Sequence, residues 1–253
     1  MVAFMLGELL FPSRIYCASC GSFIDDTRPY ALCDDCMEMF HWTNGRMCSK
    51  CGKPMQEDYP HDVCTDCRDA GHFFEKGYSC VQYGLYEKEL VLSLKYGGKA
   101  YIGKIIGKIM ADRLEVEEYI PDVIVAVPMH RKKERKRGYN QAEIIAAELA
   151  KLLGIPFKSG LLVRKANTLA MSRLAPEERR MNIENTIMAS PKGAAGIHEK
   201  NILLVDDIYT TGSTASECAR ALLEAGGAEV RVITFAAGAN IIRWDKGAAQ
   251  VCG

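Results

Sequence analysis

Two aspartates end an apolar run and are followed at once by a short loop rich in hydroxyl groups, in the stretch Ile202-Leu-Leu-Val-Asp-Asp-Ile-Tyr-Thr-Thr-Gly-Ser-Thr214. The backbone amides of the loop, where it opens a helix, would hold an anion, because unpaired N–H groups and the positive end of the helix dipole converge there. Asp206 and Asp207 would repel that same anion. The stretch therefore predicts a ligand that carries a phosphate and, close to it, hydroxyl groups or a bound cation that a carboxylate can hold. The loop consists of Thr210, Thr211, Gly212, Ser213 and Thr214.

Eight of the eleven cysteines form four Cys-x-x-Cys pairs. A shift of 31 residues superposes the first two pairs on the last two, and also Cys20-Gly21 on Cys51-Gly52. We interpret this as a duplicated unit in which each copy holds one structural zinc ion by four thiolates; interleaved pairing across the copies is the alternative. Redox pairs are disfavoured, since no α/β pattern surrounds them. The expected ligands are Cys17, Cys20, Cys33 and Cys36 for one ion, and Cys48, Cys51, Cys64 and Cys67 for the other.

The sequence pattern changes near residue 76, from cysteine pairs to the alternating strands and helices that must position the aspartates and the loop. Strand-like segments at 78–86, 123–127, 161–163, 182–188, 202–205 and 230–235 alternate with helical periodicity at 90–95, 102–109, 141–153 and 213–225, and a basic loop is expected at 131–137. Such alternation predicts an α/β fold with a mostly parallel sheet covered on both faces, and ligands at the carboxyl ends of its strands. We expect a double zinc-ribbon module at 1–75 and an α/β domain at 76–253.

Charge is distributed unevenly, although the formal net charge is zero and the pI is near 6.9. Residues 121–180 hold 13 Lys or Arg against 6 Asp or Glu, whereas residues 17–69 hold 5 against 10. The acidic zinc module should repel a nucleic-acid backbone and is interpreted as a structural or protein-docking element. The opening residues 1–11 lack a basic start and a cleavage site, and no later apolar run reaches a membrane span, so we predict a cytoplasmic protein.

The stretch Val205–Thr214 resembles the signature of type I phosphoribosyltransferases. More of the chain resembles one branch, the ComF family, in which paired zinc knuckles precede a phosphoribosyltransferase domain. That likeness rests on Leu94–Gly98, on Val127–His130 with Arg137–Gln141, and on Arg180–Asn182.

The resemblance implies that the loop Thr210–Thr214 cradles the 5-phosphate of phosphoribosyl pyrophosphate (PRPP), and that Asp206 and Asp207 hold the ribose diol. It also implies a mobile cover over 168–180, from which Arg173 closes on the substrate, and a Mg²⁺ ion bound with PRPP. The pyrophosphate would be held by Met129, His130, Arg131 and Lys132.

Two functions follow as expectations. The first is an enzyme that transfers ribose 5-phosphate to an unidentified acceptor and releases pyrophosphate, with Asp206, Asp207, Arg131 and Arg173 as its catalytic residues. The alternative is a non-catalytic protein that binds PRPP, or single-stranded DNA through the basic 131–137 loop, in DNA uptake and recombination. A protein partner is expected on the acidic zinc module. Metal removal should unfold residues 1 to about 75 and leave PRPP binding intact.

Overall fold

A four-stranded parallel sheet forms the centre of the computed structural model, which describes residues 15–165 and 186–239. Its order is β1-β6-β5-β2, and every neighbouring pair is parallel. The strands are β1 (Gly77–Gln82), β6 (Glu229–Ala237), β5 (Asn201–Tyr209) and β2 (Val123–Ala126). The predicted α/β fold with a mostly parallel sheet is confirmed.

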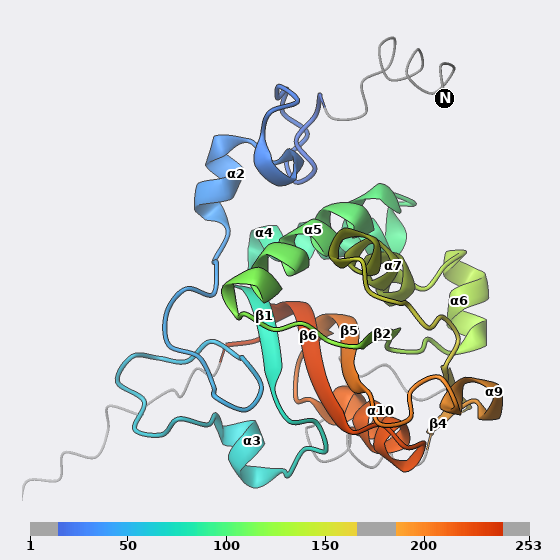
Figure 1. Ribbon diagram of the computed structural model, residues 1–253. Coiled ribbons are helices and arrows are strands. Elements are labelled where there is room, and N and C mark those ends of the chain that lie inside the picture. Colours follow the sequence, from blue (N-terminus) through green and yellow to red (C-terminus); the bar gives the residue numbers. More distant parts are fainter. Residues whose placement is uncertain (1–14, 166–185, 240–253) are drawn as a thin grey trace, which may run out of the picture.

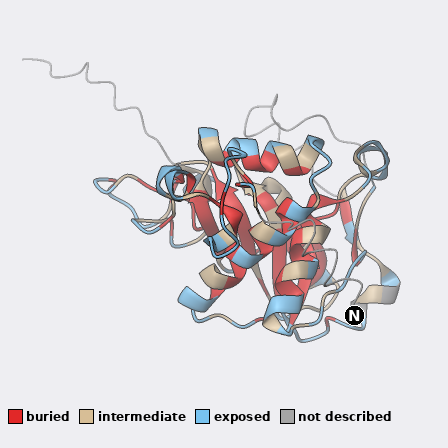
Figure 2. Ribbon diagram, turned by 90° about the horizontal axis from the view of Figure 1, so that it is seen from above, coloured by how far each residue is buried: buried red, intermediate tan, exposed pale blue. Residues whose placement is uncertain are grey.

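Helices cover both faces of this sheet (Figure 1). On one face lie α4 (Leu85–Tyr96), α5 (Tyr101–Val116) and α7 (Gln141–Leu153), and on the other lies α10 (Ser213–Glu224). Because both faces are covered, β2 is buried throughout and β5 is buried from Ile202 to Val205. Figure 2 shows buried residues along the strands and exposed residues on the outer sides of the helices. No helix in the described part of the chain combines the length and apolar character needed to cross a membrane.

The basic run 131–137 is a helix, α6 (Arg131–Arg137), and not the loop expected from its charge. The backbone N–H of Lys132 donates to Nδ1 of His130 at 3.2 Å, which caps the first turn, and Gly138 ends the helix with φ 91°. Lysine and arginine are good helix formers, and they favour the negative C-terminal end of the helix dipole. The caps at His130 and Gly138 therefore stabilise a helix in a segment that composition alone assigned to a loop.

The strand expected to continue to residue 86 ends at Gln82, and α4 begins at Leu85. The reason is the buried carboxylate of Glu87, which accepts hydrogen bonds from the backbone N–H of Gly84 at 3.1 Å and of His41 at 2.7 Å. The acid thus caps the helix and binds a segment from the zinc module at the same point.

A separate pair of short antiparallel strands, β3 (Leu162–Arg164) and β4 (Ile187–Ala189), lies outside the main sheet, and α9 (Pro191–Ala194) follows it. The strand predicted at 182–188 corresponds to β4 in part. Residues 182–185 of that prediction lie outside the described residues.

The 31-residue repeat is visible in the backbone of the two ribbons. An isolated antiparallel bridge joins Tyr16 to Phe23 in the first and Met47 to Pro54 in the second. A short helix follows at the same offset, α2 (Asp34–Met39) and then α3 (Thr65–Asp69), and the first copy adds a 3-10 turn, η1 (Pro29–Ala31). The knuckle glycines Gly21 and Gly52 have φ of 77° and 69°, which lets each knuckle turn its amides towards sulfur.

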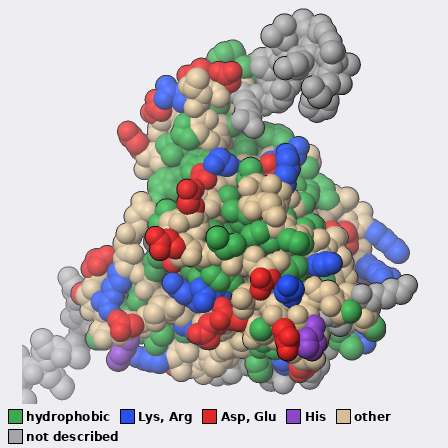
Figure 3. All heavy atoms as spheres, in the orientation of Figure 1, with side chains coloured by type: hydrophobic (Ala, Val, Ile, Leu, Met, Phe, Trp, Pro, Cys, Tyr) green, Lys and Arg blue, Asp and Glu red, His purple; other side chains and the backbone are tan. Residues whose placement is uncertain are grey.

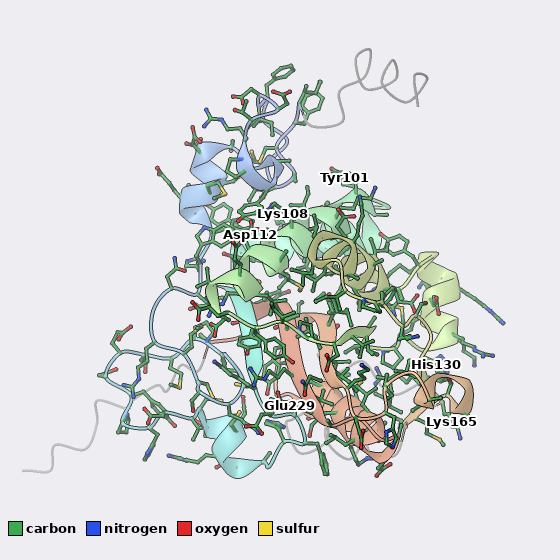
Figure 4. All side chains as sticks on the ribbon, in the orientation of Figure 1. Tyr101, Lys108, Asp112, His130, Lys165 and Glu229 are labelled. Atoms are coloured by element: carbon green, nitrogen blue, oxygen red, sulfur yellow. The ribbon has the colours of Figure 1, made fainter. Side chains whose placement is uncertain are left out.

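The two ribbons pack against different parts of the α/β domain (Figures 1 and 4). The first meets α5, where the Tyr30 hydroxyl donates to Oδ2 of Asp112 at 2.8 Å, on the side of α5 that faces the ribbon. The second lies on β1, where Gly77 N–H donates to the Lys50 carbonyl at 2.7 Å. A Cβ on Gly52 would stand 2.5 Å from the Gly77 carbonyl oxygen, so only glycine permits this close approach.

Candidate functional site

The paired aspartates lie near the carboxyl end of β5, beside the carboxyl end of β2. Val205 is the register partner of Ala126, so Asp206 and Asp207 follow directly on one strand and Pro128–Lys132 on its neighbour. The topology therefore brings together the two segments that the sequence assigned to ribose and to pyrophosphate, at the edge where parallel sheets bind ligands.

Asp207 is neutralised by protein groups. It is 4% exposed, its Oδ2 pairs with the ammonium of Lys95 from α4, and the side-chain amide of Gln141 donates to its Oδ1 at 3.5 Å. Burial alone would raise the pKa of Asp207, but the positive charge of Lys95 and the hydrogen bonds to the carboxylate together outweigh burial and lower that pKa below its usual 3.8. This carboxylate is thus ionised and already has its cation.

Asp206 is in the opposite electrostatic situation. Burial, and then the negative charge of Asp207, raise its pKa well above 3.8. Its Oδ1 accepts the Asp207 backbone N–H at 2.8 Å, and its charge also interacts with Arg164 of β3 and Cys218 of α10. A carboxyl group with a raised pKa and no close ion pair among the described residues is suited to take up a cation or to accept substrate hydroxyls.

The phosphate loop has the geometry of an anion site. Gly212 has φ 80°, and α10 begins at the next residue. Within the described part of the chain no side chain caps this helix, so its first N–H groups point outward. The hydroxyls of Thr211 and Ser213 stand 3.0 Å apart at the same end. Amides and hydroxyls therefore converge at the positive end of a 12-residue helix.

Positive charge gathers on the α6 side of the site. Figure 3 shows Lys and Arg side chains at the edge of the molecule formed by α6, whose residues 131–133 are exposed. Burial, and then the charges of Arg164 and Arg137, lower the pKa of Lys133. Such crowding of cations would be relieved by a polyanion.

Two motifs quoted only for the family likeness turn out to hold the site in place. Asn140 donates from Nδ2 to the Val127 carbonyl at 3.0 Å and caps α7, so it fixes the segment after β2. Gln141 joins Asp207 to Arg137, whose guanidinium lies 5.1 Å from the Tyr96 ring centroid.

Lys95 and Arg164 were likewise not assigned a role from sequence. Lys95 lies within the quoted Leu94–Gly98 motif, which was a usable signal, because a lysine at a helix end near paired acids can serve as their counter-ion. Arg164 sits in a three-residue strand and had no distinguishing pattern.

The cysteine sulfurs form two clusters in the sequential grouping, Cys17, Cys20, Cys33 and Cys36, then Cys48, Cys51, Cys64 and Cys67, with the four sulfurs of each within 4.8 Å of one another. A Zn–S bond of about 2.3 Å would place tetrahedral thiolates about 3.8 Å apart. The sulfurs of Cys20 and Cys33 are 3.6 Å apart, and those of Cys51 and Cys64 are 3.7 Å apart. The backbone N–H of Cys64 donates to the Cys48 sulfur at 3.2 Å. Both donor sets therefore fit structural zinc.

Most of the predicted site residues lie at one edge of the sheet. The structure places Asp206, Asp207 and the loop 210–214 on and after β5, and Met129–Lys132 after β2. Arg173, together with the predicted cover over 168–180, lies outside the described residues.

Comparison with known families identifies both modules. Residues 6–68 match a double zinc ribbon domain, and residues 99–251 match a phosphoribosyl transferase domain. The second match covers more than half of the chain, so the chain belongs to the phosphoribosyl transferase domain family. The ComF-type combination of a double zinc ribbon with this domain, expected from the motifs, is confirmed.

Curated relatives carry the same likeness over part of their length. Competence protein F of Haemophilus influenzae is 32% identical over 114 residues, which are 45% of this chain and 49% of that protein. DNA utilization protein YhgH of Salmonella typhimurium is 30% identical over 148 residues, 56% of this chain and 63% of that protein. The chain thus spans less than two thirds of either relative.

Among solved structures, the glutamine PRPP amidotransferase of B. subtilis is 21% identical, and the alignment covers 54% of this chain and 26% of that one. The TM-score is 0.35, too low for that structure to inform the site.

Proposed function

We propose that this protein binds PRPP and transfers its ribose 5-phosphate to an acceptor, with release of pyrophosphate. The observation that carries the proposal is the uncapped N-terminal end of α10 beside the two aspartates of β5, whose pKa values are shifted in opposite directions. One ligand that needs both is a phosphorylated sugar. The loop 210–214 would take the 5-phosphate, and Asp206 would accept the ribose hydroxyls.

The pyrophosphate would lie against Met129, His130, Arg131 and Lys132, supported by the cationic α6. Magnesium, when bound with PRPP, would offset the negative charge of the pyrophosphate, and Asp206 is the carboxylate suited to hold it. The chain's own residues would contribute mainly position and electrostatics, since positive charge builds at the ribose as the pyrophosphate leaves. Arg173 is retained as a proposed catalytic residue.

A glycine variant tests the phosphate loop. A Cβ at Gly212 would overlap the Tyr209 hydroxyl and stand 2.8 Å from Cε1 of His72, at a φ of 80° that L-residues avoid. Gly212→Ala should weaken PRPP binding at least about tenfold, measured by calorimetry with Mg²⁺. Gly154→Ala is the matched control, because Gly154 has φ 68° in open space at the far end of α7. Equal PRPP affinity in wild type and both variants would refute this assignment of the loop.

The second candidate is binding of single-stranded DNA without chemistry. It is favoured by α6, on which Arg135 and Lys136 are exposed together with residues 131–133, and by the names of the relatives, a competence protein and a DNA utilization protein. Exposed cations on one short helix suit phosphate contacts, which give affinity without sequence readout.

Charge reversal separates the candidates. Arg135→Glu/Lys136→Glu should abolish DNA binding, and wild-type affinity should fall steeply with salt, because bound counterions are released. Lys99→Glu/Lys104→Glu, which changes as many charges outside α6, is the control. DNA affinity that is independent of salt would exclude the candidate, whereas pyrophosphate release from PRPP with a panel of bases would establish transfer.

The remaining assignments are proposals of the same kind. We retain a boundary near residue 75 between the two modules, a protein partner on the acidic zinc module, and a cytoplasmic location. The last is supported by clustered thiolates, which persist in a reducing compartment.

A further inference from the structure

Tyr209 links the second cysteine cluster to the phosphate loop. It is the last residue of β5, directly before Thr210, and its side chain is 3% exposed. The ammonium of Lys53, two residues after Cys51, lies 5.8 Å from the centroid of its ring and pairs with Asp66, which lies between Cys64 and Cys67. The residue that precedes the phosphate loop is therefore in contact with Lys53, a side chain of the second ribbon that is held next to its cysteine cluster.

The chain that leaves the second ribbon closes over the same point. His72 stacks on Phe74 with ring centroids 4.9 Å apart, and its Nε2 lies 3.4 Å from the Tyr209 hydroxyl. The backbone N–H of Phe73 donates to Oγ of Ser216 at 3.1 Å, on the first turn of α10. Lys53 thus lies against Tyr209, and segment 72–74 contacts both Tyr209 and one side of the first turn of α10.

Gly212 is the residue of the phosphate loop that contacts Tyr209 and His72. The Tyr209 hydroxyl and His72 Cε1 occupy the space that a Cβ of Gly212 would need, so the backbone of Gly212 lies directly on them. A glycine at φ 80° has many other conformations open to it, and these two side chains restrict it to one. Preorganised amides bind an anion better than mobile ones, because the ordering cost has already been met.

The first cluster offers an internal comparison. Its ribbon contacts α5 through Tyr30 and Asp112, and its Cys20 is exposed. In the second cluster Cys48, Cys51 and Cys64 are all buried. The same donor set is therefore present twice in one chain, and the copy that packs on Tyr209 is the more enclosed.

We propose that the second four-cysteine site is a positioning element of the phosphate loop. The site holds the segment that carries Lys53 and Asp66 against the Tyr209 ring, and Tyr209 with His72 fixes Gly212. Loss of metal from this site loosens the loop and weakens PRPP binding, whereas loss from the first site does not. The part of this inference that concerns PRPP rests on the proposed function. It replaces the expectation, made from sequence, that PRPP binding is indifferent to metal removal.

The test compares Cys64→Ser with Cys33→Ser, the equivalent ligands of the two copies, in the full reduced chain. Hydrogen exchange measured without PRPP should accelerate in a peptide covering 208–216 for Cys64→Ser and stay at wild-type rates for Cys33→Ser. The hydrogen-exchange rate of a peptide covering β2 serves as the control, since it should stay at the wild-type value if the α/β fold is intact. PRPP affinity, measured with Mg²⁺, should fall at least about tenfold for Cys64→Ser and change less than about twofold for Cys33→Ser.

A second variant leaves all eight cysteines in place. Tyr209→Phe should retain two zinc ions by elemental analysis and accelerate exchange in the same peptide. It should also weaken PRPP binding about threefold to tenfold, because the hydroxyl that packs against Gly212 and bonds to His72 is lost. Linkage also requires the reverse effect. Saturating PRPP should raise the zinc affinity of the second four-cysteine site, measured by competition with a chelator. The factor should equal the factor by which zinc at that site raises the affinity for PRPP.

The outcomes separate the inference from the proposed function. Loop exchange that responds to Cys64→Ser and Tyr209→Phe, but not to Cys33→Ser, supports the positioning role even if wild type fails to bind PRPP, a result that would refute only the proposed function. Loop exchange that responds equally to both cysteine variants, or to neither, overturns the inference. A Tyr209→Phe variant with wild-type loop exchange overturns it as well.

Discussion

Asp206→Asn should stabilise the protein while abolishing most of its affinity for PRPP with Mg²⁺. Burial and the adjacent negative charge of Asp207 raise the pKa of Asp206, so its ionised form is disfavoured in the folded chain. The amide keeps the shape of the side chain and cannot ionise. We expect the free energy of unfolding to rise by about 1–2 kcal/mol, as at other sites where function opposes stability, and PRPP affinity to fall at least about tenfold.

The pH dependence of the free energy of unfolding shows whether the raised pKa of Asp206 is the cause of this stabilisation. A carboxyl group whose pKa is raised on folding binds its proton more tightly in the native chain, so it makes wild-type stability fall as the pH rises from 3.8 through the folded pKa. The Asp206→Asn variant lacks that dependence. Its advantage should therefore be largest at neutral pH and shrink as the pH falls, in urea unfolding measured between about pH 5.5 and 8. Both proteins carry the same cysteine clusters, so their difference isolates Asp206.

A control variant removes a charge elsewhere. Asp122→Asn lies just before β2, at the opposite edge of the sheet, where the carboxylate accepts the Asn201 backbone N–H at 2.8 Å. It should leave PRPP affinity unchanged. If Asp206→Asn is less stable than wild type at neutral pH, the assignment of a raised pKa to Asp206 is wrong.

The parts of this molecule that follow from sequence are those with a local physical signature. Apolar runs in the sequence predict β2, β5 and β6. Helical periodicity predicts α7 with its observed bounds of 141 and 153. The cysteine repeat gave both clusters, because the ligand spacing and the knuckle glycine are set by the metal geometry and not by the rest of the fold.

The parts that sequence did not reveal depend on contacts between distant segments. Glu87 caps α4 locally through the N–H of Gly84, but its second bond, to the N–H of His41 46 residues away, is encoded by no local pattern. The contact of Lys53 with the ring of Tyr209 is of the same kind. Sequence analysis divided the chain at a change of texture near residue 75, yet Gly52 and Gly77 bring the two sides into backbone contact. A change in composition along the chain therefore does not exclude close packing between the segments on its two sides.

Lys95→Met should be the most destabilising single change among those considered for the site. The ammonium of Lys95 is the counter-ion of Asp207, and the two side chains are 18% and 6% exposed. Methionine retains much of the apolar stem and leaves a buried carboxylate without its cation. Removing one member of a buried pair typically costs about 3–5 kcal/mol, so we expect a fall of that size in the free energy of unfolding. The double variant Lys95→Met/Asp207→Asn should recover most of it.

A surface pair of the same composition serves as the control. Lys108 and Asp112 on α5 are 2.6 Å apart, and their side chains are 54% and 34% exposed, so Lys108→Met should cost less than about 1 kcal/mol. If Lys95→Met costs no more than Lys108→Met in urea unfolding, Asp207 is not held by a buried pair. A large cost with recovery in the double variant would mean that Lys95 keeps Asp207 ionised and occupied, which leaves Asp206 as the carboxylate of the pair that is open to a substrate-bound cation.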